Sequence, residues 1–172
     1  MGSMEPALHL WANQLSATGI SGWLSTREWL IATSQSIHIV MLSVVFGCAV
    51  LINLRLLGVN SRSRPVSALV GTLVPWMYRA LLVLLATGVL QTVAEPLREF
   101  VSPAFWAKMA MVLIAVLLTA TLSRSVRRNR ERWDHAASRP RTAALIALVS
   151  LALWIAIIFC GRFIGYTWEN YA

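Results

Sequence analysis

The chain has 172 residues, of which 58% are hydrophobic and only 13% are charged, so it has too few charges to cover a soluble globule. Its formal net charge is +8, but the arginines gather in two stretches between long apolar runs, as they do in the loops of polytopic membrane proteins. We therefore expect a membrane protein whose partner is the lipid bilayer, and no nucleic-acid partner.

The N-terminal part of the chain is amphipathic. Leu8, Trp11 and Leu15 recur at helical spacing with polar residues between them, which predicts a short interfacial helix over about residues 5–16. Gly19 and Gly22 are expected to interrupt helical structure after it. The sequence Ser-Thr-Arg-Glu at 25–28 has the form of a capping box, which predicts that the Ser25 hydroxyl caps the first long helix.

Four apolar runs follow, and each is long enough to cross a bilayer, which takes roughly 20 helical residues. Gly58 is expected to end the first run, and Ser102 with Pro103 is expected to begin the third. Short connections predict antiparallel neighbours. The predicted fold class is all-α, an antiparallel bundle of four transmembrane helices after the interfacial helix, in one membrane domain over residues 1–172 with spans at about 28–57, 67–94, 103–122 and 142–166.

The distribution of cationic residues predicts the orientation of the bundle. Most arginines lie in the loops after the first and third spans, and the second of these loops, 123–141, carries seven of them: Arg124, Arg127, Arg128, Arg130, Arg132, Arg139 and Arg141. Cytoplasmic loops are enriched in Lys and Arg. We expect both basic loops in the cytoplasm, where 123–141 is solvated and touches anionic lipid, and both termini on the opposite side.

His38 is an ionisable residue within the first apolar run, one turn after Gln35 and one turn before Met41. Such residues are costly in a membrane and face the bundle interior, where they usually serve function. His38 could be an axial haem ligand, a copper ligand together with Met41, or a hydrogen-bonding residue in a ligand cavity. The structural alternative is a histidine that only fixes the packing of two helices.

Two cofactors are compatible with these residues. His9 falls in the predicted interfacial helix and His135 in the predicted loop, so a single chain cannot supply two histidines to haem b inside the membrane. A haem would need His38 alone, His38 with Met41, or ligands shared across a dimer. Copper(I) would use soft ligands, which the apolar runs contain as His38, Met41, Cys48, Met77, Met109, Met111 and Cys160.

Lys108 and Arg162 lie near the same end of their spans as His38. With Trp106 and Tyr166 they could line a cationic pocket suited to a carboxylate, a haem propionate or a quinone oxygen, although both side chains could instead extend to the interface. Three cationic groups at one depth repel each other unless a negative group is among them. We expect Glu28, Glu95 and Glu99 to be too shallow to provide that charge, which favours a bound anion.

An inner polar cluster is expected at the other end of the bundle. It comprises Asn53, Arg55 and Arg79, where Arg79 pairs with Asn53 or reaches anionic headgroups. The sequence contains no glycine-rich phosphate loop, no Cys-x-x-Cys, no Ser/His/Asp arrangement and no HExxH. We therefore expect no hydrolytic chemistry and no enzyme acting on its own.

Several motifs together resemble a family of uncharacterised bacterial four-helix inner-membrane proteins, with weaker similarity to CopD-type copper-resistance proteins and small cytochrome b-like bundles. The motifs are Gln35-x-x-His38, Asn53-Leu-Arg-Leu-Leu-Gly58, Pro75-Trp76, Thr87-Gly88, Pro103-x-Phe105-x-x-Lys108 and Gly161-Arg162-x-Ile164-x-Tyr166. The family pattern is E-x-x-H and D-L-R-L-L-G, so this chain has amides where the family has acids. The resemblance implies a bacterial inner membrane with periplasmic termini, and it brings no established activity.

The function expected from these observations is binding of a small anionic or redox ligand, such as haem or a quinone, in an intramembrane pocket around His38. The residues expected to contribute are His38, Gln35, Met41, Lys108, Trp106, Arg162 and Tyr166, with His38 pointing into the bundle. One alternative is a non-catalytic subunit or scaffold that packs against a membrane partner or a second copy. Another is a small copper or solute permease.

Overall fold

The computed structural model describes residues 4–59, 64–135 and 142–167, with side chains from residue 7 to residue 164 within those ranges. The described part is all-α and contains no strand, which confirms the predicted fold class. Four helices are long and apolar enough to cross a membrane. The elements are α1 (Met4–Ser16), α2 (Gly19–Ser25), α3 (Glu28–Leu56), α4 (Val66–Ala94), α5 (Pro96–Phe100), α6 (Pro103–Arg128), α7 (Arg130–Asp134) and α8 (Thr142–Thr167).

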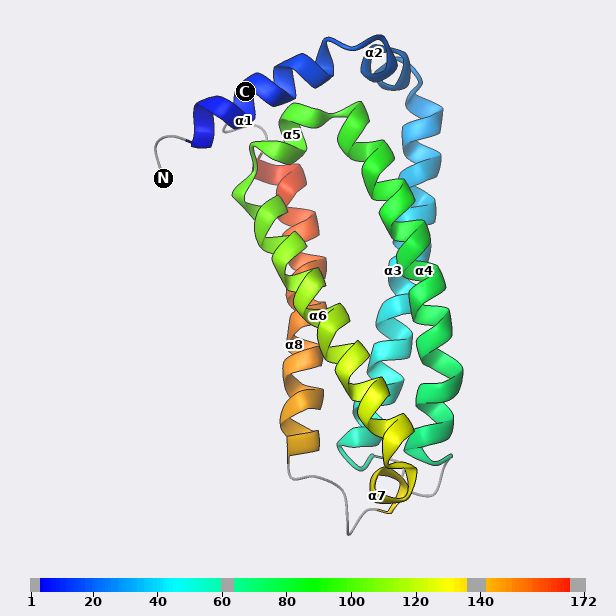
Figure 1. Ribbon diagram of the computed structural model, residues 1–172. Helices are drawn as coiled ribbons and strands as arrows, with labels where there is room; N and C mark the ends of the chain where they lie inside the picture. The colour runs from blue at the N-terminus through cyan, green and yellow to red at the C-terminus, as the bar shows by residue number, and fades with distance from the viewer. Residues whose placement is uncertain (1–3, 60–63, 136–141, 168–172) are drawn as a thin grey trace.

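The long helices form an antiparallel bundle (Figure 1). Helix α3 packs along α4, α6 packs along α8, and α3 contacts α8 more extensively than α4 contacts α6. Three short helices, α1, α2 and α5, lie at one end of the bundle, which we call the α5 end, and α7 lies at the other, the α7 end. Helix α1 lies across the α5 end and contacts α5.

Two expectations about the beginning of the first span were wrong. Ser25 does not cap α3, because it is the last residue of α2 and its hydroxyl donates to the Gly22 carbonyl at 3.1 Å. Helix α3 begins at Glu28 without a side-chain cap. Gly22 does not interrupt helical structure either, because it lies within α2. The break after α1 falls at residues 17 and 18, directly before Gly19, where α2 begins with the Thr18 side chain as its cap.

The end of α3 is as predicted. Gly58 has a φ of +87°, a left-handed conformation that glycine adopts without steric cost. The Gly58 amide donates to the Arg55 carbonyl at 3.2 Å and the Val59 amide donates to the Leu54 carbonyl at 3.0 Å. These two bonds form the Schellman motif, which satisfies carbonyls that the end of the helix leaves free.

The basic segment after the third span is more ordered than expected. Helix α6 continues to Arg128, beyond the predicted end at 122, and α7 follows over Arg130–Asp134. Trp133 is only 3% exposed, and its indole donates to the Ser125 hydroxyl at 3.2 Å. Residues 136–141 of the predicted loop, with Arg139 and Arg141, lie outside the described residues.

Helix α7 is also bonded to the beginning of α4. The Asp134 carboxylate accepts the Ser67 amide at 2.9 Å with one oxygen and the Ser67 hydroxyl at 2.7 Å with the other. The first amides of a helix have no partner within the helix, and carboxylates are favoured there by the helix dipole. Asp134 therefore caps α4 from a distant part of the chain, a contact that the description of 123–141 as a solvated loop did not predict.

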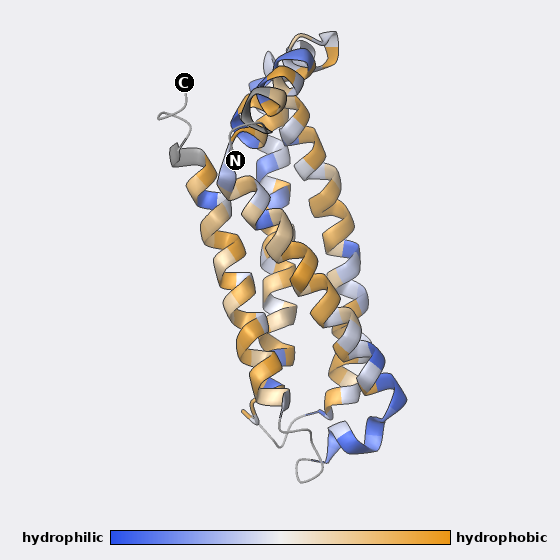
Figure 2. Ribbon diagram, turned by 60° about the vertical axis from the view of Figure 1, so that its left-hand side comes forward, coloured by the Kyte–Doolittle hydropathy of each residue, from blue (hydrophilic) through white to orange (hydrophobic). Residues whose placement is uncertain are grey.

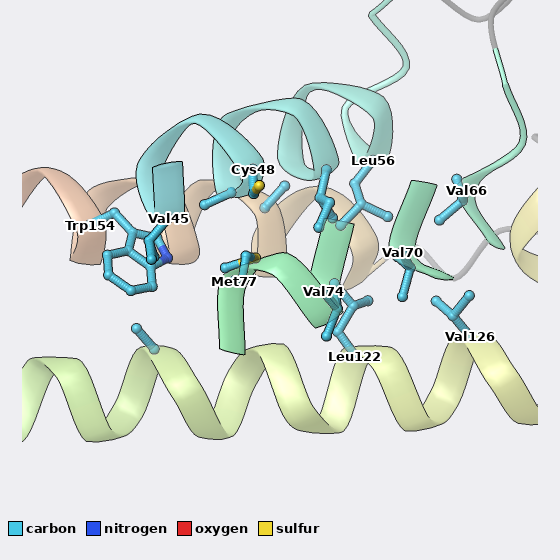
Figure 3. Packing of buried hydrophobic residues seen from close by; sticks show 14 of the residues in the cluster. Val45, Cys48, Leu56, Val66, Val70, Val74, Met77, Leu122, Val126 and Trp154 are labelled. Carbon is cyan, nitrogen blue, oxygen red and sulfur yellow. The ribbon is translucent and has the colours of Figure 1, made fainter. Parts of the chain in front are cut away.

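The buried core is a narrow apolar seam between the four long helices. Figure 3 shows Trp154 of α8 beside Val45 of α3, and Met77 of α4 opposite Cys48. Many large apolar side chains of the long helices are instead exposed, among them Ile39, Leu82 and Leu145. Figure 2 shows that hydrophobic residues run along most of the length of these helices. Such an outward-facing surface suits lipid, since hydrocarbon tails solvate leucine as well as a protein core does.

Candidate functional site

His38 reaches from α3 to α4, as expected of a residue that points into the bundle. Its Nδ1 lies 2.7 Å from the Thr87 hydroxyl oxygen. That hydroxyl is also 2.9 Å from the Val83 carbonyl oxygen, one turn earlier on α4. A hydroxyl has one proton, so when Thr87 donates it to Val83 the bond from His38 must be donated by Nδ1–H. The Nε2 nitrogen of the neutral ring is then an acceptor left for another partner.

Two glycines border the functional side chains. A Cβ at Gly88 of α4 would lie 3.8 Å from the His38 Cε1 atom, and a Cβ at Gly161 of α8 would lie 3.9 Å from the Lys108 Cδ atom. The imidazole therefore lies against α4, and the lysine stem extends from α6 across α8. Each of the four long helices contributes to this level of the bundle.

Lys108 is close to a carboxylate, contrary to expectation. Its ammonium lies 3.9 Å from the Glu99 carboxylate, and the two side chains are only 19% and 15% exposed. The ammonium also lies 5.3 Å from the centre of the Phe105 ring and within electrostatic range of His38. Helix α5 brings Glu99 down toward the bundle, so the expectation that the acidic residues are too shallow was wrong for Glu99.

Polar atoms without a hydrogen-bond partner gather at the same end. Among the buried side chains of the described residues, four such atoms lie near the α5 end: Ser34 Oγ, Gln91 Nε2, Arg98 Nε and Ser102 Oγ. Ser34 is one turn before His38 and Gln91 one turn after Thr87, and antiparallel packing brings both to one depth. We call Ser34, His38, Thr87, Gln91, Glu99 and Lys108 the polar layer.

Several predicted site residues lie elsewhere. Gln35 is exposed, and Met41 packs half-buried against the apolar core. Trp106 is 48% exposed and donates to the Phe100 carbonyl at 3.0 Å. Arg162 is exposed on α8. The Tyr166 side chain lies outside the described residues.

The predicted inner polar cluster is divided among separate contacts. Asn53 is buried and its amide donates to the Ser150 hydroxyl of α8 at 3.0 Å, while Arg55 donates to the Arg64 carbonyl at 2.9 Å. Arg79 is exposed, with its guanidinium 5.2 Å from the centre of the Trp76 ring. Of the two alternatives for Arg79, pairing with Asn53 was wrong, because Asn53 is buried against α8 while Arg79 is exposed. Contact of Arg79 with anionic headgroups stays a prediction.

A small cavity adjoins the Asn53–Ser150 pair. It has a volume of about 10 Å³ and is bordered by all four long helices. This volume holds about one water molecule, and the hydroxyl groups of Ser150 and Thr119 with the Asn53 amide make its wall partly polar. The cavity lies in the α7 half of the bundle, separate from the polar layer.

The candidate copper ligands are dispersed in the structure. Among the described residues no three His, Cys, Asp or Glu side chains gather as metal ligands. Cys48 and Met77 are buried in the apolar core, and Met109 is largely exposed on α6. Cys160 is a free, partly buried thiol of α8, next in sequence to the glycine that borders the Lys108 stem.

Part of the polar layer has a sequence signal that the motifs described above do not include. Ser34 and His38 are four residues apart in the first span, and Thr87 and Gln91 are four residues apart in the second. Polar residues at this spacing lie on one face of a helix, so each pair predicts a polar stripe facing the other. Glu99 could not be found this way, because its approach to Lys108 depends on the short helix α5.

The fold and the polar layer together define a class, the four-helix integral membrane proteins with ionisable groups buried at one end of the bundle. Within that class the chain belongs to the family of unknown function DUF6644, whose profile matches residues 11–167. No curated protein and no solved structure matches the chain. The comparisons give no support to the similarity to CopD-type proteins or cytochrome b-like bundles.

Proposed function

We propose that this protein binds a small ligand with hydrogen-bond acceptor oxygens, of the quinone type, in the polar layer around His38. The observation that carries the proposal is the set of buried polar groups without a partner at the α5 end, two of which, on Ser34 and Gln91, belong to the polar layer. Leaving such a group unpaired costs about 1–3 kcal/mol, so several of them at one end of the bundle call for a partner. A ligand in contact with them would supply the missing partners.

The chemistry of these groups favours acceptor oxygens on the ligand. Gln91 Nε2 and Arg98 Nε can only donate, and the Ser34 and Ser102 hydroxyls can donate as well. Lys108 faces Glu99, and Arg98 is bonded to Glu95, so the local charges compensate one another. A neutral carbonyl compound fits this balance better than a free anion, a carboxylate or a haem propionate.

Haem b is a second redox ligand to consider. Because Nδ1 of His38 contacts Thr87, the ring is oriented by a second residue and Nε2 is free to bind iron, as in many metal-ligating histidines. An absorbance spectrum of the purified protein tests this version directly. A Soret band that disappears in His38→Leu would show that the ligand is haem b and not a quinone.

The scaffold alternative is favoured by one contact. The His38–Thr87 hydrogen bond joins α3 to α4 and could exist only to fix their packing. The two functions predict different results when the groups without a partner are removed. A ligand site would bind its ligand more weakly, whereas a scaffold would pack as well as before.

Gln91→Leu separates the two functions. It removes a buried amide nitrogen without a partner, so we expect the melting temperature of the ligand-free protein in detergent to stay the same or rise. We also expect the dissociation constant for ubiquinone-0, measured by quenching of tryptophan fluorescence, to rise about tenfold, the equivalent of one lost hydrogen bond.

Gln35→Leu is the matched control, because it makes the same substitution at an exposed position of α3. It should change neither quantity. If ubiquinone-0 binds equally well to the parent protein and to Gln91→Leu, or binds to neither, the proposed function is wrong and the scaffold alternative gains.

A further inference from the structure

A second cavity lies outside the bundle, at the α5 end. It is an open groove of about 450 Å³ between α1 on one side and α5 with the beginning of α6 on the other. Sites for small molecules usually have volumes of roughly 300–1,000 Å³ and mostly apolar walls. Helix α1 contributes Leu8, Trp11 and Leu15 to the groove, and Phe100 and Trp106 form the opposite wall.

The groove has almost no free polar groups. The Thr18 hydroxyl donates to the Leu15 carbonyl at 2.6 Å, and Trp106 donates its indole N–H to the Phe100 carbonyl. This leaves the Gln14 amide and the Trp11 indole N–H as the polar side-chain groups of the lining that are not used in those bonds. A peptide segment would need many more partners for its backbone, so the groove suits a hydrocarbon chain, which needs none.

The groove and the polar layer share a wall. The Phe100 ring lies 5.8 Å from the Phe105 ring, which lies 5.5 Å from the Trp106 ring and 5.3 Å from the Lys108 ammonium. Phe100 also directly follows Glu99, the carboxylate that faces Lys108. One layer of aromatic rings therefore has apolar space on one side and the charged pair on the other.

We infer that the groove binds the alkyl or isoprenoid tail of a membrane amphiphile whose polar head reaches the polar layer. The inference rests on the proposed function for the head alone, because the tail site is defined by the groove. The tail would enter sideways from the lipid, under α1, and pass the edge of the aromatic wall. The ligand class thereby narrows from any small acceptor compound to one with a long apolar tail.

Two probes with the same head test the inference. Ubiquinone-0 has no tail and decylubiquinone has a ten-carbon tail, and both can be titrated into the purified full-length protein at one detergent concentration. Leu15→Trp fills the groove, whereas Leu10→Trp places the same side chain on an exposed face of α1. We expect Leu15→Trp to weaken decylubiquinone binding about tenfold, equivalent to removing roughly two methylene groups from apolar contact. Neither variant should change ubiquinone-0 binding.

The outcomes distinguish this inference from the proposed function. If Leu15→Trp and Leu10→Trp bind decylubiquinone alike, the groove does not hold the tail, even where ubiquinone-0 still binds in a manner that depends on Gln91. If ubiquinone-0 does not bind but decylubiquinone binds and is weakened only by Leu15→Trp, the groove inference holds and the proposed function is wrong. Circular dichroism on both variants shows whether α1 has kept its helix.

Discussion

Polar residues within the apolar spans of this protein form hydrogen bonds with polar residues of neighbouring helices. His38 contacts Thr87 on the neighbouring helix, and Asn53 contacts Ser150 on a helix 97 positions further along the chain. Hydrocarbon offers no hydrogen bonds, so each of these side chains needs a protein partner or a ligand. In the Asn53 pair the amide donates to the Ser150 hydroxyl, whereas in the His38 pair a ring that donates from Nδ1 has its Nε2 available as an acceptor.

Replacing Ser150 by alanine should destabilise the protein modestly. The Asn53 amide would lose its acceptor, and interhelical hydrogen bonds in membranes average about 0.6 kcal/mol, with a maximum near 1.7 kcal/mol. A double-mutant cycle with Asn53→Ala, followed by unfolding in mixed micelles, measures the coupling. Ser43→Ala is the control, because the Ser43 hydroxyl bonds only to its own helix. Additive effects in the cycle would show that the pair contributes nothing.

Helix α7 packs against the core although its composition is that of an exposed segment. Four of its five residues are charged, yet Trp133 places it against the core and Asp134 caps α4. The exposed arginines at the end of α6 and on α7 therefore sit on a fixed support, at the hydrophilic end of the bundle in Figure 2. Such a support would hold them at one height beside anionic headgroups.

Asp134→Ala should loosen the beginning of α4. Loss of a helix cap costs about 0.5–2 kcal/mol, and here it would leave the Ser67 amide without its partner. Hydrogen exchange of residues 66–69 should accelerate while the middle of α4 stays protected. Glu131→Ala changes an exposed acidic residue of the same helix and should leave the exchange unaltered. Equal exchange in both variants would contradict the role assigned to Asp134.

The molecule as a whole buries little of its apolar surface. Between 11% and 28% of the most apolar 18-residue stretch of each span is buried inside the bundle, and the apolar remainder suits a lipid bilayer. The charge pattern predicts that the α7 end faces the cytoplasm and that the α5 end, with the polar layer and the groove, faces the periplasm. A ligand would then reach both sites from the outer leaflet or the periplasm.

Cysteine labelling tests this orientation. In a background where Cys48 and Cys160 are replaced by alanine, single cysteines at exposed Thr26, Arg64 and Arg130 report on the two ends. An impermeant maleimide should modify the cysteine at position 26 in intact cells, and those at 64 and 130 only after the membrane is permeabilised. The reverse pattern would invert the orientation of the bundle.

The long helices could be predicted from sequence because bilayer thickness fixes their length, and Gly58 because few other residues adopt its conformation. Local rules failed where tertiary contacts prevailed: Ser25 ends a glycine-containing helix, and Trp133 draws a basic segment onto the core. Within the site, His38 was found because its burial is costly anywhere in a span. The approach of Glu99 to Lys108 could not be predicted, because it depends on the short helix α5 that carries Glu99.

The bond between Asp134 and Ser67 also has a consequence for biosynthesis. The two residues are 67 positions apart, and a chain leaves the ribosome from its N-terminus. If the hairpin of α3 and α4 inserts as the chain emerges, α6 and α7 have not yet left the ribosome. The first amides of α4 would then be hydrated at the surface that is predicted to be cytoplasmic. The cap on α4 can form only after Asp134 has emerged from the ribosome. A nascent chain arrested before Asp134 would therefore have an α4 that frays at its first residues.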